Sequence, residues 1–133
     1  MTIYQVSAGE ALQNWAFYEK KIKRVLARAD SGCTPEDVLT CVQLGSMQLW
    51  RDAECKAVGV TEIQTFPLFK VLLVFMVAGE DVRTWLQDGQ RQFDSFAKQS
   101  GCKYVEFLGR PGWERMLDGF GYGRKMVRMR KEL

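Results

Sequence analysis

The chain has 133 residues and no histidine, and this absence limits the chemistry that it can perform. A Ser-His-Asp triad, a Cys-His dyad and a His-ligated zinc or haem each need an imidazole, so the sequence excludes all of them. Carboxylates, tyrosine, lysine, cysteine, backbone amides and a bound cofactor remain. The four cysteines, at positions 33, 41, 55 and 102, include no pair at CxxC spacing, so no metal site is predicted.

Charge is unevenly distributed along the chain. The net charge is +3, and the segment Lys103–Leu133 holds eight Lys and Arg against four Asp and Glu, which leaves about −1 for the rest. A basic C-terminal end could meet an anionic partner, although a solvated outer face of a terminal strand is the simpler interpretation. The candidate contact residues are Trp50, Arg124, Lys125, Arg128 and Arg130. Contact with nucleic acid through this segment is the less favoured alternative.

The spacing of apolar residues predicts four helices and six strands. Helices are expected from Ser7 to Ala29, from Thr34 to Gly45, from Asp81 to Gly101 and from Gly112 to Gly121. Strands are expected at Ile3–Val6, Met47–Ala53, Ala57–Phe66, Phe69–Val77, Lys103–Leu108 and Tyr122–Lys131. Val127 and Met129 should lie on one face of the last strand. The most apolar of the strands, Phe69–Val77, should be buried on both faces.

This order, β-α-α-β-β-β-α-β-α-β, indicates a mixed α/β fold around one mostly antiparallel sheet. Residues 1–133 are expected to form a single domain, because no linker, repeat or low-complexity segment interrupts them. The longest apolar run, Val71–Ala78, is too short to cross a bilayer, and the first residues lack the pattern of a signal peptide. No membrane association is therefore expected.

The C-terminal third carries a resemblance to a known family. The segments Gly101-Cys102-Lys103-Tyr104-Val105-Glu106-Phe107-Leu108-Gly109-Arg110 and Pro111-Gly112-Trp113-Glu114-Arg115-Met116-Leu117, followed by Gly119-Phe120-Gly121-Tyr122, resemble the GNAT superfamily of N-acetyltransferases. More narrowly, the chain resembles the short GNAT-like proteins of tailed bacteriophages and prophages. The resemblance implies a GNAT-like sheet, the cytoplasm of a bacterial host with incorporation into the virion, and a phage structural protein as partner, with an oligomer also compatible.

The loop that binds coenzyme in this family departs from the family pattern. Family members carry Arg/Gln-x-x-Gly-x-Gly/Ala, whose amides hold the pyrophosphate of acetyl-CoA. The corresponding stretch here is Val77-Ala78-Gly79-Glu80-Asp81-Val82-Arg83, with one glycine and two carboxylates. Asp81 is expected to cap the following helix. If acetyl-CoA binds, the resemblance places it on Val77, Gly79, Val82 and Arg83.

The resemblance also implies where proton transfer would occur. Family members use a carboxylate to deprotonate the amine and often a tyrosine to protonate the thiolate, which makes Glu62 a tentative base and Tyr104 or Tyr122 a candidate acid. A solvent-facing strand carboxylate and two half-buried aromatics are the simpler interpretation. The sequence therefore favours a non-catalytic interaction protein with a degenerate acetyl-CoA loop, acting in the virion or in head assembly. The alternative is an acetyl-CoA-dependent N-acetyltransferase with a divergent pyrophosphate loop.

Overall fold

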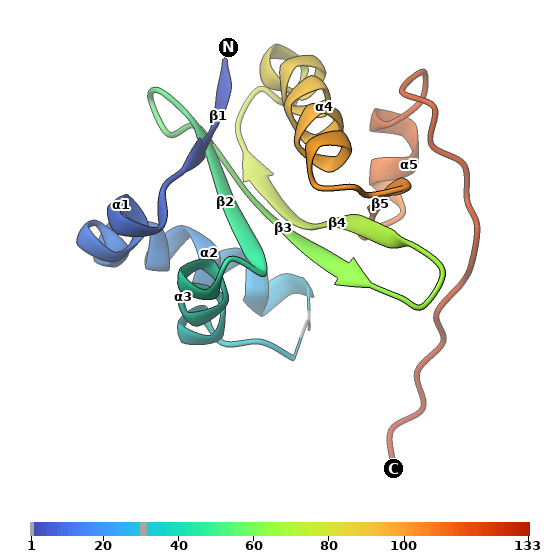
Figure 1. The fold of residues 1–133 in the computed structure, drawn as a ribbon, viewed down its shortest axis with the longest axis horizontal. Coiled ribbons are helices and arrows are strands. Elements are labelled where there is room, and N and C mark those ends of the chain that lie inside the picture. Colours follow the sequence, from blue (N-terminus) through green and yellow to red (C-terminus); the bar gives the residue numbers. More distant parts are fainter. Residues whose placement is uncertain (1, 30–31) are drawn as a thin grey trace.

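The computed structural model describes residues 2–29 and 32–133, which form a five-stranded sheet with helices on both faces (Figure 1). The elements are β1 (Ile3–Val6), α1 (Ala8–Gln13), α2 (Trp15–Ala29), α3 (Pro35–Leu44), β2 (Met47–Asp52), β3 (Ala57–Thr65), β4 (Lys70–Gly79), α4 (Val82–Gln99), β5 (Tyr104–Phe107) and α5 (Gly112–Met116). No helix in the described ranges is long and apolar enough to cross a bilayer.

The sheet has the spatial order β1-β2-β3-β4-β5. The first four strands pair antiparallel, and α4 returns the chain so that β5 pairs parallel to β4. Helices α1 to α3 cover one face, where Tyr18, Ile22 and Val38 are buried against β2, β3 and β4. Helices α4 and α5 lie on the other face, where Trp85 and Phe93 are buried. The mixed α/β fold expected from the sequence is thus confirmed.

Local signals in the sequence position several of these elements. Thr34 and Asp37 form a reciprocal capping box at the start of α3, and Gly45 ends that helix with φ of 85°. The apolar run forms β4, which lies between β3 and β5 in the sheet and has helices on both faces. An apolar strand is expected at such a position. These features fix the frame on which the candidate site is built.

Three expectations are wrong. The first helix is divided at Asn14, because asparagine competes for backbone hydrogen bonds and so interrupts helices. Asp81 occupies the cap position of α4 but has a left-handed backbone, φ 50°, and its side chain makes no capping hydrogen bond. Residues 122–131, all within the described part of the chain, form no strand.

Candidate functional site

Strands β4 and β5 separate at a defined point. Their parallel pairing runs from Val71 opposite Tyr104 to Val74 opposite Phe107. The Leu108 amide donates to the Val74 carbonyl at 3.0 Å, and β4 then continues alone to Gly79. The register of β3 against β4 shifts between Val60 and Thr61, so β4 also carries an irregularity beside the gap. We call the side of β4 that β5 leaves unpaired, from Phe75 to Gly79, the gap.

The four residues expected to bind coenzyme lie along the far end of this gap. The Glu80 amide donates to the Lys56 carbonyl at 3.3 Å, which makes that position a hydrogen-bonded one in the β3–β4 ladder. Because such positions alternate in an antiparallel ladder, the amides of Val77 and Gly79 point away from β3 and into the gap. Val82 and Arg83 follow in the first turn of α4.

The loop packs closely against β3. A Cβ on Gly79 would lie 2.8 Å from the Lys56 carbonyl oxygen and 2.9 Å from the Ala57 Cα, so this glycine serves close packing against β3. The Glu80 amide is already engaged with Lys56. Both the Glu80 and the Asp81 residues are exposed at the start of α4, where a phosphate would have to sit. One backbone amide of this loop is therefore engaged with β3, and two exposed carboxylates stand at the start of α4.

Substitution of Gly79 tests this packing role. Gly79→Ala should lower the free energy of unfolding by about 1–3 kcal/mol, because the new methyl group meets backbone atoms that cannot move aside. Gly9→Ala in α1 is the control, since a Cβ there meets nothing within 4 Å and should stabilise the helix by roughly 0.5–1 kcal/mol. Urea unfolding followed by circular dichroism measures both. A neutral Gly79→Ala would show that the contact with β3 can relax.

A row of side chains crosses the sheet beside the gap, on the face of α2 and α3. Glu62 pairs in register with Leu73, and Leu73 pairs with Glu106, so all three share one face. The two carboxylates are separated by two strand spacings, about 10 Å between Cα atoms. Both residues are half-buried, and Glu62 accepts a hydrogen bond of 3.0 Å from Gln64 Nε2. The row could attract an ammonium group.

Glu106 was missed by sequence reasoning, because only the register of β5 against β4 places it opposite Leu73. The tyrosines do not complete a proton-transfer set. Tyr104 is at the start of β5, away from the gap, with its ring 5.1 Å from that of Phe69. The Tyr122 hydroxyl donates to Gln90 Oε1 at 2.6 Å, and burial, assisted by Asp94, raises the pKa of this phenol above its ordinary value. It therefore remains protonated and committed to Gln90.

Trp50, expected as an exposed contact residue, is instead 3% exposed. Its ring packs edge-on against Phe93 and Phe96, at 5.2 and 5.6 Å between centroids, and its Nε1 donates to Thr61 Oγ1 at 3.0 Å. The expectation fails because α4 covers the face of β2 on which Trp50 lies.

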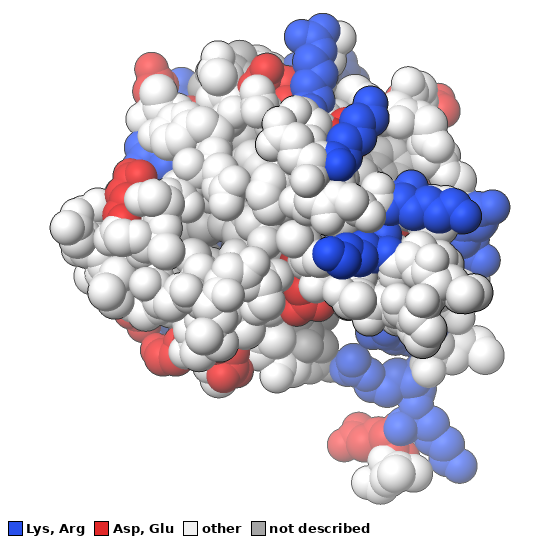
Figure 2. Space-filling model, viewed as in Figure 1, with Lys and Arg blue, Asp and Glu red and all other residues white. Residues whose placement is uncertain are grey.

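The basic C-terminal residues are exposed. Arg124 forms an ion pair with Glu114, and Lys125, Arg128 and Arg130 continue along the segment. Figure 2 shows Lys and Arg side chains along the right-hand part of the visible face and down this segment, with Asp and Glu mainly along the left and lower rim. The surface thus retains a basic side on which an anionic group could bind.

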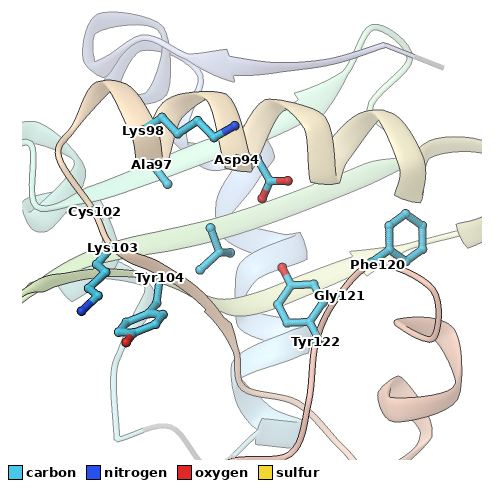
Figure 3. A pocket seen from close by; sticks show the side chains of 10 residues that line it. Asp94, Ala97, Lys98, Cys102, Lys103, Tyr104, Phe120, Gly121 and Tyr122 are labelled. Carbon is cyan, nitrogen blue, oxygen red and sulfur yellow. The ribbon is translucent and has the colours of Figure 1, made fainter.

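A groove of about 250 Å³ lies on the face of α4, over the start of β5. The C-terminal half of α4 forms one wall and residues 120–122 form the other. Ala97, Val105 and Phe120 give it apolar surface, and the Asp94 carboxylate and the Tyr122 hydroxyl point toward one another across it (Figure 3). Sequence reasoning missed this groove, because its walls are distant along the chain.

No family model matches the chain, and a search of the curated proteins finds no match. Solved structures do share its fold. A probable acetyltransferase superposes with a TM-score of 0.71 at 7% identity, covering 100% of this chain and 97% of that one. The ribosomal-protein-alanine N-acetyltransferase of Brucella melitensis biovar Abortus 2308 gives 0.65 at 8% identity, covering 100% of both chains. The glucosamine-6-phosphate N-acetyltransferase of Arabidopsis thaliana gives 0.63 at 15% identity, covering 98% and 97%. The chain therefore has the fold of the GNAT acetyltransferases.

Proposed function

We propose that this chain is a non-catalytic, partner-binding protein built on the GNAT fold. One observation carries the proposal: the Glu80 amide is bonded to the Lys56 carbonyl, with two exposed acidic residues at the start of α4. One amide of the loop that holds the pyrophosphate in GNAT acetyltransferases is thus engaged, and two carboxylates lie beside it. The exposed basic C-terminal segment supplies a surface for another molecule.

The carboxylates of Glu80 and Asp81 would repel a bound phosphate. A phosphate 4 Å from one carboxylate is repelled by about 1 kcal/mol in water and about 4 kcal/mol at an effective dielectric of 20. Each 1.4 kcal/mol is a tenfold loss of affinity. Arg83 offsets part of this repulsion, but two carboxylates face one guanidinium at the start of α4. Coenzyme affinity is therefore expected to be lost.

We place this binding role among the structural proteins of a tailed phage, in the virion or in head assembly, with synthesis in the cytoplasm of the bacterial host. The support for this setting is the sequence resemblance to short phage GNAT-like proteins. The basic segment with Arg124, Lys125, Arg128 and Arg130 is the surface proposed to meet the partner.

Acyl transfer from acetyl-CoA is the second candidate function. It is favoured by the backbone amides of Val77 and Gly79, which point into the gap between β4 and β5 and could bind an amide-bearing chain. Glu62, in the row with Glu106, would then attract the amine of the acceptor. In that case the carboxylates at the start of α4 would lower the affinity for coenzyme without abolishing binding.

A thermal melt with and without acetyl-CoA separates the two functions. We expect no shift of Tm at millimolar coenzyme, at low or high salt. A ligand at 100 times its dissociation constant would stabilise the fold by about 2.7 kcal/mol, which is roughly 2–8 °C for a domain of this size. A shift that persists in high salt would overturn the proposal in favour of acyl transfer. Glu62→Gln should then retain the shift and lose turnover.

A further inference from the structure

The turn between β3 and β4 carries exposed apolar side chains at one end of the sheet. Its residues 66–69 are Phe-Pro-Leu-Phe, and the Phe66 amide donates to the Phe69 carbonyl at 2.9 Å. Leu68 is 91% exposed and Phe66 is 47% exposed. Tyr104, at the start of β5, lies beside the turn and is 46% exposed. We call Phe66, Leu68, Phe69 and Tyr104 the tip. Apolar side chains that are exposed together mark a contact with another protein or with a membrane.

Contacts between the rings give the tip a fixed shape. The centroid of the Phe69 ring lies 5.1 Å from that of Tyr104 and 5.8 Å from that of Phe66. Phe69 and Tyr104 meet edge to face, with 87° between the ring planes. Leu68, next to these rings in the chain, is the most exposed side chain of the tip. The tip is therefore preorganised, and little conformational entropy is lost when it binds.

Two lysines flank the tip. Lys70 is the first residue of β4, and Lys103 directly precedes β5. The Lys103 amide donates to the Lys70 carbonyl at 2.9 Å, so the two residues are neighbours, and both are exposed. The stretches 63–70 and 101–105 contain no acidic residue. Figure 2 shows Lys and Arg side chains above and below the place where Figure 1 shows this turn. An apolar tip with positive flanks complements a layer that is apolar inside and negative at its surface.

We propose that the tip docks this protein on the surface of an anionic lipid bilayer, with Leu68 among the acyl chains and the lysines among the headgroups. Lys70 is two residues from Leu68, so no more than about 7 Å of backbone separates them. Apolar faces of proteins that lie on a bilayer enter it by about 5–10 Å. Leu68 is therefore inserted while the ammonium groups stay beside the lipid phosphates. Tyr104, with an apolar ring and a hydroxyl, suits the boundary between the two regions.

The packing of the tip favours a bilayer over a nucleic acid. Bases stack on aromatic faces that are free. Here Phe69 packs against two other rings, and the Lys103 ammonium lies 5.5 Å from the centroid of the Tyr104 ring. The most exposed side chain, Leu68, is aliphatic and offers no ring for stacking. Acyl chains accept such a side chain without a preformed pocket.

Contact with a bilayer surface needs no spanning helix. It is therefore compatible with the finding that no helix in residues 2–29 and 32–133 can cross a membrane. The expectation of no membrane association rested on spanning segments and signal peptides, and neither is needed for docking through a surface tip. The inference goes beyond the proposed function, because it adds a lipid surface to the protein partner.

Sedimentation with lipid vesicles tests the proposal on the full chain. Vesicles of phosphatidylcholine with a quarter phosphatidylglycerol should bind the protein. Phosphatidylcholine alone should bind it about 25-fold more weakly, since each lysine near an anionic surface contributes about fivefold in affinity. Leu68→Gln should lower the affinity for the anionic vesicles at least about tenfold, because it removes the inserted apolar group. Leu12→Gln is the matched control and should bind like the wild type. Leu12 is 58% exposed on α1, which follows β1 at the opposite edge of the sheet.

Both variants should keep the melting curve of the wild type, because both leucines are exposed. A wild type that stays in the supernatant at millimolar lipid would overturn the proposal. So would a Leu68→Gln variant that binds the anionic vesicles as tightly as Leu12→Gln. Fluorescence anisotropy with an oligothymidine tests the other class of anionic partner, and binding to it without binding to vesicles would also overturn the proposal. The tip lies at the start of β4 and the gap at its end, so the outcome does not depend on coenzyme binding.

Discussion

Replacement of Asp52 by alanine should lower the free energy of unfolding by about 3–5 kcal/mol. Asp52 is fully buried at the end of β2. Its Oδ1 accepts from the Ala57 amide at 2.7 Å and its Oδ2 from the Glu54 amide at 3.2 Å. Each hydrogen bond to a charged group contributes about 1.5–3 kcal/mol. Alanine would leave both amides without this partner.

The effect extends to the candidate site, because Asp52 holds the turn that carries Lys56. The Lys56 carbonyl accepts from the Glu80 amide, on which the proposed loss of coenzyme binding rests. Asp52→Ala should therefore also speed hydrogen exchange at the Glu80 amide. Asp52→Asn is the control, since its amide oxygen can retain one of the two bonds and about half of the stability. Urea unfolding and hydrogen exchange measure the two effects, and an alanine variant as stable as the wild type would contradict this role.

The parts of the fold that could be predicted from sequence are those fixed by local chemistry. Thr34, Asp37 and Gly45 bound α3 through short-range hydrogen bonds and a left-handed turn, and a sequence pattern carries that information directly. The central position of β4 follows from a run of apolar residues that no exposed strand would tolerate. Such signals do not depend on what lies elsewhere in the chain.

The features that could not be predicted depend on register or on a partner. Glu106 joins Glu62 only through the alignment of β5 with β4, which no local signal specifies. The segment from Tyr122 to Lys131 has the alternation of a strand, but alternation produces a strand only where a neighbour pairs with it and buries one face. In the structure no strand pairs with residues 122–131, which is why the strand expected there is absent.

The burial of Trp50 also could not be predicted from the sequence. Trp50 is followed by Arg51 and lies two residues after Gln48, and a tryptophan among such polar residues resembles a surface residue. Yet Gln48 and Thr61 are buried too, at 3% and 0% exposure, because they satisfy one another and the indole. Thr61 Oγ1 donates to Gln48 Oε1 at 2.7 Å and accepts from Trp50 Nε1. A polar residue that finds a buried partner cannot be recognised from its own type.

Thr61→Val should consequently cost about 2–5 kcal/mol of unfolding free energy, although valine matches threonine in shape. The substitution removes one hydroxyl and leaves both the Trp50 indole N–H and the Gln48 carbonyl oxygen buried without it, at about 1–3 kcal/mol each. Thr61→Ser keeps the hydroxyl and loses only a methyl group, so about 1 kcal/mol is expected for it.

Urea unfolding followed by tryptophan fluorescence measures the free energy of unfolding of both variants. Which variant loses more stability shows whether the hydroxyl or the methyl group of Thr61 matters more. If serine proves the more damaging replacement, packing of the methyl group dominates at this position. If valine does, a hydrogen-bonded relay between β2 and β3 holds Trp50 against α4 and keeps it from solvent. Trp50 is then required in the core, so the aromatic side chain that the sequence favoured for a partner contact cannot serve as one in this fold.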